Sequence, residues 1–350
     1  MSLPMKIAGG LFDLALLVLV MLLVLRADSN LILLALLTVL LLLPIALAAA
    51  FAWMFSRSMQ PALQQRAWAF GTLSAVATLC VAYAFSVLAV DRELAVADHG
   101  AAYGDCHKVW ATRGLVDPAL TKVASAGNTP QTLAAAFARG APGVEVDVYY
   151  DPALADFVVS HDFPYEQKVD GGPLMLATLL AQTDPSKHYW LDFKRHGKLS
   201  RDQADAAAAR LVAIAGDTGV ARERLWIEGT EPFNLLPFKA AGFRTIFDVH
   251  PPRDAHLLTP FVTELHKAVY ALAGFTVMGM NYGTVEAPIY GPVARQRLGD
   301  IPVFLYHVPR ERGLLAELAR IPQVRVLMAG DHSADVFDIN ACEVPAAGVR

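Results

Sequence analysis

Apolar residues are concentrated in the first quarter of this 350-residue chain, and this uneven distribution constrains its fold more than any other feature. Residues 8–25, 31–55 and 67–90 form three apolar stretches, and each is long enough to cross a bilayer as a helix of about 20 residues. A break of only five residues separates the first two stretches, which predicts a tight helical hairpin. The sequence therefore predicts three transmembrane α-helices in residues 1–90. A cleaved signal peptide is the alternative for the first stretch.

Basic residues predict the orientation of these helices. Lys6 precedes the first stretch, and Arg57 and Arg66 lie between the second and the third. Because cytoplasmic loops are enriched in Lys and Arg, we expect a cytoplasmic N-terminus and a periplasmic or extracellular location for everything after residue 90, on a bacterial inner membrane. Asp13 lies inside the first stretch. We expect it to be solvated near the cytoplasmic end, and a functional intramembrane carboxylate is the alternative.

The rest of the chain has the length of one (β/α)₈ barrel. A linker at residues 91–102 leads to this domain at residues 103–350, in which strand-like apolar segments alternate with Ala-rich segments that end on Gly or Pro. Strands are expected at 103–109, 143–150, 188–194, 225–229, 245–250, 275–281, 303–307 and 324–328. Helices are expected at 132–139, 203–216, 234–241, 264–272, 292–298 and 313–321. This alternation predicts an α/β fold, a TIM-type barrel.

Charge and cysteine content limit the partners and the compartment. The formal net charge is −4 and the sequence has no basic stripe, so no nucleic acid partner is expected. Cys80 lies in the third apolar stretch, and Cys106 and Cys342 lie near the two ends of the barrel domain. The first and last strands of a closed barrel are neighbours, so a Cys106–Cys342 disulfide can form outside the cytosol. Two unrelated buried thiols are the alternative.

Charged side chains gather at the expected strand ends, where barrel enzymes carry their reactive groups. Glu145 and Asp147 share one side of a strand because they are two residues apart, and so do Asp192 and Lys194. The other polar residues at the first strand and its neighbours are His107, Lys108, His161 and Asp162. Further polar residues near the expected mouth are Glu228, His250, Asn281, Tyr282, His307 and Asp331, which can contact a leaving group or make ordinary hydrogen bonds.

This set of residue types suits phosphodiester chemistry. Like charges on one inward-facing strand need a cation or a proton between them, and the three carboxylates Glu145, Asp147 and Asp192 offer hard oxygen ligands to Mg²⁺ or Ca²⁺. Two histidines can serve as general acid and general base. Each residue alone is more often structural, but the order H…ExD…HD…DxK on successive strand ends predicts metal-assisted cleavage of a phosphodiester.

The same residues resemble a known family. His107, the segment GVEVDV and the segment VVSHD are similar to the signature of the glycerophosphodiester phosphodiesterases, within the phospholipase-C-like barrels that include sphingomyelinase D. The segments NTPQTLAAAFARGAPGVEVDV and WLDFK extend the resemblance, which covers residues 106–194. It implies that His107 and His161 are the acid/base pair and that a divalent cation binds to the three carboxylates. It also implies that Lys194 and Lys108 contact the substrate, a small phosphodiester or a phospholipid.

Departures from the family pattern leave alternatives open. The family usually carries arginine directly after its first histidine, where this chain has Lys108, and Asp192 stands where glutamate is common. The choice between a glycerophosphodiester and a sphingomyelinase-D-like substrate therefore stays open. A non-catalytic barrel that binds a phosphorylated ligand or a protein partner is the main alternative function. A transporter, and a glycosidase using Glu145 and Asp147, are less favoured, because glycosidase carboxylates lie on opposite sides of the sugar bond.

Overall fold

The computed structural model describes residues 83–84, 86–116, 126–254, 256–329 and 336–339. The chain divides into two compact units, Met1–Ala95 and Val96–Arg350. Residues 83–84 and 86–96 are helical, so a helix extends into the predicted linker. The expected membrane spans at 8–25 and 31–55, and most of the third, lie outside the described residues. Within the described part, no helix combines the length and the hydropathy that a membrane crossing needs.

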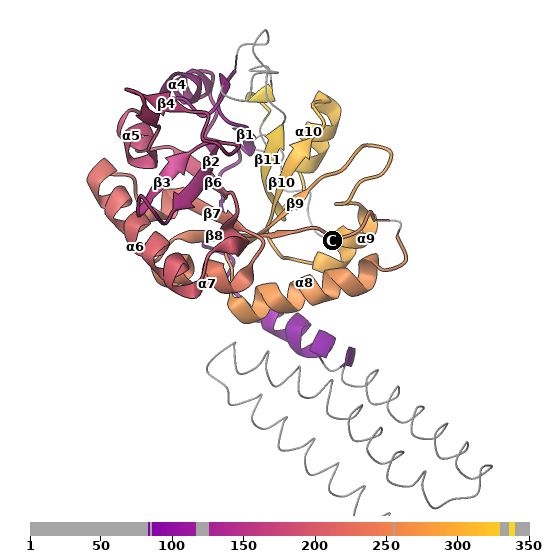
Figure 1. Ribbon diagram of the computed structural model, residues 1–350. Helices are drawn as coiled ribbons and strands as arrows, with labels where there is room; N and C mark the ends of the chain where they lie inside the picture. The colour runs from indigo at the N-terminus through magenta and orange to yellow at the C-terminus, as the bar shows by residue number, and fades with distance from the viewer. Residues whose placement is uncertain (1–82, 85, 117–125, 255, 330–335, 340–350) are drawn as a thin grey trace, which may run out of the picture. The chain divides into compact units, whose positions relative to one another are not determined.

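The second unit contains a closed barrel of parallel strands (Figure 1). Each strand pairs in parallel with the next, and β1 pairs with both β2 and the last strand, β11, which closes the barrel. The barrel strands are β1 (Val109–Ala111), β2 (Gly143–Asp151), β6 (His188–Phe193), β7 (Leu225–Gly229), β8 (Arg244–Val249), β9 (Val277–Asn281), β10 (Val303–Val308) and β11 (Val324–Ala329). The predicted TIM-type barrel is thereby confirmed.

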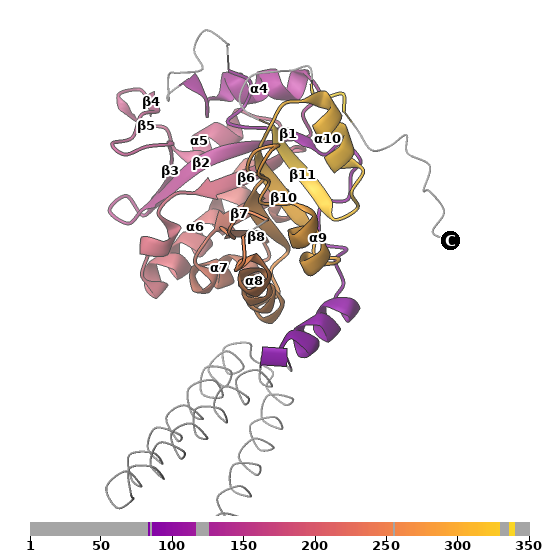
Figure 2. The same ribbon diagram turned by 90° about the vertical axis from the view of Figure 1, so that its right-hand side faces the viewer.

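Helices cover the outside of this barrel (Figure 2). They are α4 (Pro130–Ala138), α5 (Leu176–Ala181), α6 (Arg201–Thr218), α7 (Pro232–Ala240), α8 (Thr259–Ala273), α9 (Pro292–Leu298) and α10 (Arg312–Ala319). Ser200 caps α6 through a reciprocal pair of hydrogen bonds with Gln203, which satisfies free backbone N–H groups at the helix start. A short strand follows β2 as β3 (Asp156–Val159), antiparallel to β2. A small separate ladder joins β4 (Lys168–Val169) to β5 (Gly172–Pro173).

Aromatic side chains fill the inside of the barrel. The rings of Trp226 and Phe304 lie 4.8 Å apart, and Trp110 contacts Phe304 at 5.7 Å between centroids. Trp190 joins the same cluster and is 1% exposed. A Cβ at Gly143 would lie 2.5 Å from the Trp110 ring, so β2 can pass this ring only with glycine at that position. The aromatic cluster fills the barrel below the C-terminal ends of the strands.

The first strand differs from its prediction. It was expected at residues 103–109, but β1 spans Val109–Ala111. Tyr103 is buried in the aromatic cluster, with its ring edge-on to Trp110 at 5.2 Å. The apolar character before residue 109 therefore reflects packing under the barrel and not strand pairing. As a consequence, the residues just before Val109 lie at the N-terminal end of β1, opposite the expected mouth.

Candidate active site

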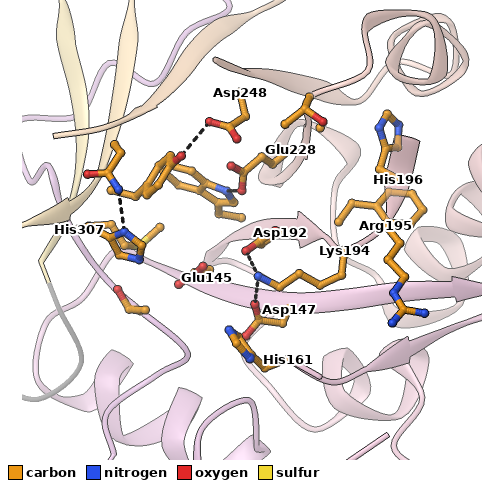
Figure 3. Close-up of a pocket in the computed structure, with 18 of the residues that line it drawn as sticks. Glu145, Asp147, His161, Asp192, Lys194, Arg195, His196, Glu228, Asp248 and His307 are labelled. Carbon is orange, nitrogen blue, oxygen red and sulfur yellow. Dashed lines mark hydrogen bonds and ion pairs between the residues drawn. The ribbon is translucent and has the colours of Figure 1, made fainter. Parts of the chain in front are cut away.

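A cavity of about 580 Å³ opens at the C-terminal ends of the strands, where the predicted site was expected (Figure 3). Asp147, Asp192 and Glu228 are register partners on β2, β6 and β7, so their carboxylates line one level of the cavity wall. The next level inward carries Glu145 and Trp190. The cavity thus lies directly on the aromatic cluster, and both acidic and basic side chains line it.

The structure brings the three predicted metal ligands together. Each of Glu145, Asp147 and Asp192 offers one oxygen, and these oxygens lie within 4.8 Å of one another. Glu145 Oε2 is buried and has no hydrogen-bond partner among the described residues. Burial, followed by the charges of Asp147 and Asp192, raises the pKa of Glu145 well above its ordinary value. An orphaned buried carboxylate oxygen beside two further carboxylates fits a divalent cation with oxygen ligands.

Lys194 provides the positive charge that the sequence predicted here. Its ammonium group lies 2.7 Å from Asp147 Oδ1 and forms a short contact with Asp192 Oδ2. Burial alone lowers the pKa of Lys194, but Asp192 and Asp147 outweigh burial and hold it above the ordinary value. At Asp192, burial raises the pKa more than the shared ammonium lowers it. Lys194 is therefore a fixed cation at the edge of the carboxylate cluster.

Asn128 is a site residue that the sequence analysis missed. Its side chain is fully buried, and it donates from Nδ2 to Asp147 Oδ2 at 2.7 Å while Oδ1 accepts from the Asp147 backbone N–H at 3.2 Å. Asn128 has a φ of 57°, in the left-handed region that asparagine tolerates better than most residues. The two bonds fix Asp147 in position. The next residue, Thr129, is the N-cap of α4.

His161 lies at the cavity as predicted. It follows β3 and lies close to Asp147 in Figure 3. Its Nδ1 lies 3.1 Å from Asp162 Oδ2, and its backbone oxygen accepts a hydrogen bond from Tyr149 Oη at 3.1 Å. A carboxylate can only accept, so Nδ1 carries the hydrogen, and Nε2 of the neutral ring is left with its lone pair. His161 is therefore arranged to act as a general base.

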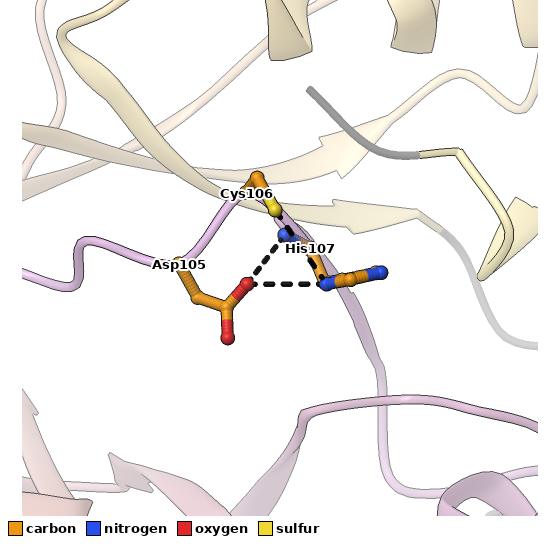
Figure 4. Close-up of side chains that lie close together, drawn as sticks. All are labelled: Asp105, Cys106 and His107. Atoms are coloured by element: carbon orange, nitrogen blue, oxygen red, sulfur yellow. Dashed lines mark hydrogen bonds and ion pairs between the residues drawn. The ribbon is translucent and has the colours of Figure 1, made fainter. Parts of the chain in front are cut away.

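His107 and Lys108 do not reach the cavity, which corrects the prediction for both. Lys108 Nζ donates to the backbone oxygens of Ala319, the last residue of α10, at 2.8 Å and of Ile321, between α10 and β11, at 3.1 Å. His107 Nδ1 lies 3.1 Å from Asp105 Oδ1 (Figure 4). Both residues precede β1 and lie at the opposite end of the barrel, because the first strand begins later than expected. The error followed directly from the misplaced strand.

Thr112 and Arg113 occupy the mouth end of β1 in their place. Both residues line the cavity directly after Ala111. Arg113 adds a guanidinium group to the cavity wall, and the sequence prediction had not assigned it to the site.

The far side of the cavity carries a second group of acids. Trp190 Nε1 donates to Glu228 Oε2 at 2.6 Å, and Tyr306 Oη donates to Asp248 Oδ1 at 3.1 Å. Burial raises the pKa of Asp248 to about 8 and the pKa of Glu228 well above its ordinary value. Of the other residues expected near the mouth, His250, Asn281 and His307 line the cavity, Tyr282 is buried outside its wall, and Asp331 lies outside the described residues.

Cys106 lies beside His107, away from the cavity, and is disulfide-bonded. Its expected partner Cys342 lies outside the described residues, as does Cys80, so the pairing stays a prediction.

Comparison with known proteins adds solved structures only. No protein-family model and no curated protein matches the chain. A glycerophosphodiester phosphodiesterase from Parabacteroides distasonis is 19% identical, with a TM-score of 0.44 over 64% of this chain and 93% of that chain. The corresponding enzyme of Thermotoga maritima is 17% identical, with a TM-score of 0.43 over 63% and 93%. A phosphodiesterase of Oleispira antarctica, solved with the product sn-glycerol-3-phosphate, is 14% identical, with a TM-score of 0.45 over 65% and 94%. The solved structures to which this chain is similar are thus phosphodiesterases at low sequence identity.

Proposed function

We propose that the protein is a membrane-anchored, metal-dependent phosphodiesterase that hydrolyses glycerophosphodiesters or phospholipid head groups. One observation carries the proposal: the carboxylates of Glu145, Asp147 and Asp192, with an orphaned oxygen on Glu145, adjoin Lys194 and His161 in a single cavity. The three apolar stretches before residue 91 support the membrane anchor, with the barrel on the outer side of a bacterial inner membrane.

The basic residues of the cavity would bind the phosphoryl group. Lys194 presents an ammonium group, and Arg113 presents a guanidinium that can form two parallel hydrogen bonds to a phosphate. Asp147 and Asp192 hold the Lys194 ammonium in place before the substrate arrives, so it stabilises negative charge that develops on the phosphoryl oxygens without a costly rearrangement. Lys194 and Arg113 are therefore the proposed phosphate contacts, and Lys108, which the resemblance implied as a substrate contact, is not one of them.

His161 would accept the proton of the attacking group. Its Nε2 lone pair can take a proton from water or from a neighbouring hydroxyl of the substrate, while Asp162 stabilises the imidazolium that forms. With water as the nucleophile, a P–O bond forms to the water oxygen as the bond to the leaving alcohol breaks, and the leaving oxygen takes up a proton from solvent. With a substrate hydroxyl, the same transfer yields a cyclic phosphate.

Glu145, Asp147 and Asp192 would hold one divalent cation, Mg²⁺ or Ca²⁺. Such a cation, when bound, polarises a phosphoryl oxygen and neutralises part of the carboxylate charge. Asn128 keeps Asp147 in the orientation that the cation needs, because both of its amide atoms are engaged with that residue.

The proposal is tested by hydrolysis with the detergent-solubilised full chain. The substrates are a panel of glycerophosphodiesters, lysophospholipids and sphingomyelin, each with Mg²⁺, Ca²⁺ or EDTA. We expect metal-dependent turnover that is lost in Glu145→Gln and in His161→Asn. His107→Asn is the matched control and should retain turnover, because His107 lies at the other end of the barrel. No turnover by the wild-type chain with any substrate and either metal would overturn the proposal.

A non-catalytic barrel that binds a phosphorylated ligand is the second candidate. One observation favours it: the Lys194 ammonium already pairs with two of the three carboxylates that would hold the cation. Binding of glycerol 3-phosphate without turnover of any phosphodiester would support this candidate.

A further inference from the structure

Asn281 and His307 form a polar pair on the cavity wall. They lie on β9 and β10, whereas the three predicted metal ligands lie on β2 and β6. Asn281 ends β9, and His307 lies near the end of β10, whose Tyr306 is the register partner of Asn281. Asn281 Nδ2 lies 2.9 Å from His307 Nδ1, and both residues line the cavity. In Figure 3, the His307 ring lies on the Glu145 side of the carboxylate cluster, and Lys194 approaches the cluster from the other side.

A backbone contact fixes the direction of the hydrogen bond in this pair. The N–H of Gly283 donates to Asn281 Oδ1 at 2.7 Å. A backbone N–H can only donate, so the atom that it faces is the amide oxygen, and the NH₂ group of Asn281 faces His307. His307 Nδ1 must therefore accept. The hydrogen of the neutral ring then lies on Nε2, so this ring is a donor through Nε2.

The backbone of His307 is irregular in two ways. Its φ is 52°, in the left-handed region that non-glycine residues rarely adopt. The pairing of β10 with β11 shifts register between Leu305 and Val308, which is a bulge around His307. Bulges near active sites commonly redirect a side chain, and a strained backbone of this kind costs of order 1–3 kcal/mol. The fold holds His307 in place at the expense of regular pairing.

From this geometry we propose that His307 is a further catalytic residue, an uncharged hydrogen-bond donor through Nε2–H to a phosphoryl oxygen of the bound substrate. The proposal rests on the proposed function of the cavity. It complements His161, whose Asp162 contact sets the opposite tautomer with a lone pair on Nε2. Asn281 is the positioning residue that fixes the His307 tautomer.

The other two histidines of the cavity lack this arrangement. His250 Nε2 lies 3.5 Å from both Asp248 Oδ2 and Tyr306 Oη, at the limit of hydrogen bonding, and its side chain is 65% exposed. His196 is 2% exposed and packs on Phe193, and neither ring nitrogen has a hydrogen-bond partner among the described residues. His307 alone of the three has a partner that dictates which nitrogen carries the hydrogen.

The first test reads the tautomer directly and needs no turnover. The full chain is labelled with ¹⁵N-histidine in detergent, and the His307 signals are assigned by their absence in His307→Gln. We expect the Nε2–H tautomer for His307 and the Nδ1–H tautomer, or the imidazolium, for His161. Inorganic phosphate should shift the His307 Nε2 signal in the wild type but not in Arg113→Met with Lys194→Met. An Nδ1–H tautomer at His307, or a signal that phosphate leaves unmoved, would overturn the proposal.

The second test uses kinetics with a matched control. We expect His307→Leu to lower kcat by about 100-fold, as loss of one fixed donor does, with little change in KM. His307→Gln should retain part of the rate because its amide N–H can donate. Asn281→Asp should lower kcat at about pH 9, where the ring is neutral because the ordinary histidine pKa is about 6.5. The carboxylate can only accept, so the single ring hydrogen moves to Nδ1 and Nε2 no longer donates.

His250→Gln is the control on the same cavity wall, and its loss should be much smaller than that of His307→Leu. Equal losses in these two variants would overturn the role of His307 and leave the proposed function standing. Absence of turnover in the wild-type chain would instead contradict the proposed function and, with it, the catalytic role of His307. The tautomer and the phosphate-induced shift would still be measured, because neither depends on turnover.

Discussion

The Lys194 ammonium lies 2.7 Å from Asp147 Oδ1 and also contacts Asp192, so one side chain neutralises part of the charge of the carboxylate cluster. Its removal should affect cation binding and phosphate binding in opposite directions. In Lys194→Met we expect a divalent cation to bind more tightly, because a competing positive charge is gone. Hydrolysis should fall by at least about 100-fold, because a phosphoryl contact is lost. Calorimetric titration with Ca²⁺ and turnover on one substrate measure both, and weaker Ca²⁺ binding would contradict the expectation.

The buried acids predict how stability depends on pH in the absence of metal. The pKa of Asp248 is raised to about 8, and the pKa values of Glu145 and Glu228 are raised as well, whereas carboxyl groups in an unfolded chain titrate near 4. The folded state therefore holds more protons between about pH 4 and pH 8. Its stability should be greatest at the acidic end of this window and fall as the pH rises.

Thermal unfolding of the full chain in detergent with EDTA should therefore show a lower Tm at pH 8 than at pH 5. Mg²⁺ or Ca²⁺ binds the deprotonated acids, so either ion should raise the Tm more at pH 8. Asp248→Asn should flatten the pH dependence, because the amide does not titrate. A Tm that rises from pH 5 to pH 8 in EDTA would show that these acids are ionised in the fold.

Substitution of Lys108 should affect the stability of the fold, whereas substitution of Arg113 should affect substrate binding. Lys108 is 7% exposed and satisfies two backbone oxygens, one at the end of α10 and one just after it. Lys108→Met should therefore lower the free energy of unfolding by about 1–3 kcal/mol, with kcat and KM retained in the folded fraction. Arg113→Met should instead raise KM, because Arg113 lines the cavity. Denaturant unfolding and steady-state kinetics on both variants check this, and a raised KM in Lys108→Met would restore the original assignment of Lys108.

The metal cluster was predictable because it depends on local rules. Glu145 and Asp147 are two apart on a strand predicted at residues 143–150 and found at Gly143–Asp151, and Asp192 lies on the next strand around the barrel. Period two and the parallel order of strands were enough to place the three carboxylates together. The strand Leu225–Gly229 was likewise predicted to the residue, so Glu228 was expected at the mouth.

The rest of the site depends on tertiary contacts that no local pattern encodes. Tyr103 is buried by packing under the barrel, and its apolar character shifted the expected first strand by six residues, which carried His107 to the wrong end. The position of Asn128 follows from a loop with a left-handed backbone, which spacing along the chain does not show. His307 was expected near the mouth from its strand, but the bulge around it depends on pairing with β11.

The role of Asn128 can be tested without straining its backbone. Asn128→Gly keeps the positive φ of 57°, which glycine adopts freely, and removes only the two hydrogen bonds to Asp147. We expect Ca²⁺ or Mg²⁺ affinity to fall by about 10- to 100-fold, as for loss of other groups that orient a metal ligand. Calorimetric titration in EDTA-stripped detergent solution measures this, with Asn128→Ala as the companion variant.

Asn128→Ala loses the same two bonds and adds the strain of alanine at a left-handed position, of order 1–2 kcal/mol. The two variants should therefore bind the cation equally weakly, while Asn128→Ala unfolds at a lower temperature. If Asn128→Gly bound Ca²⁺ as tightly as the wild type, the amide would only support the fold, and Asp147 would be held by β2 and Lys194 alone.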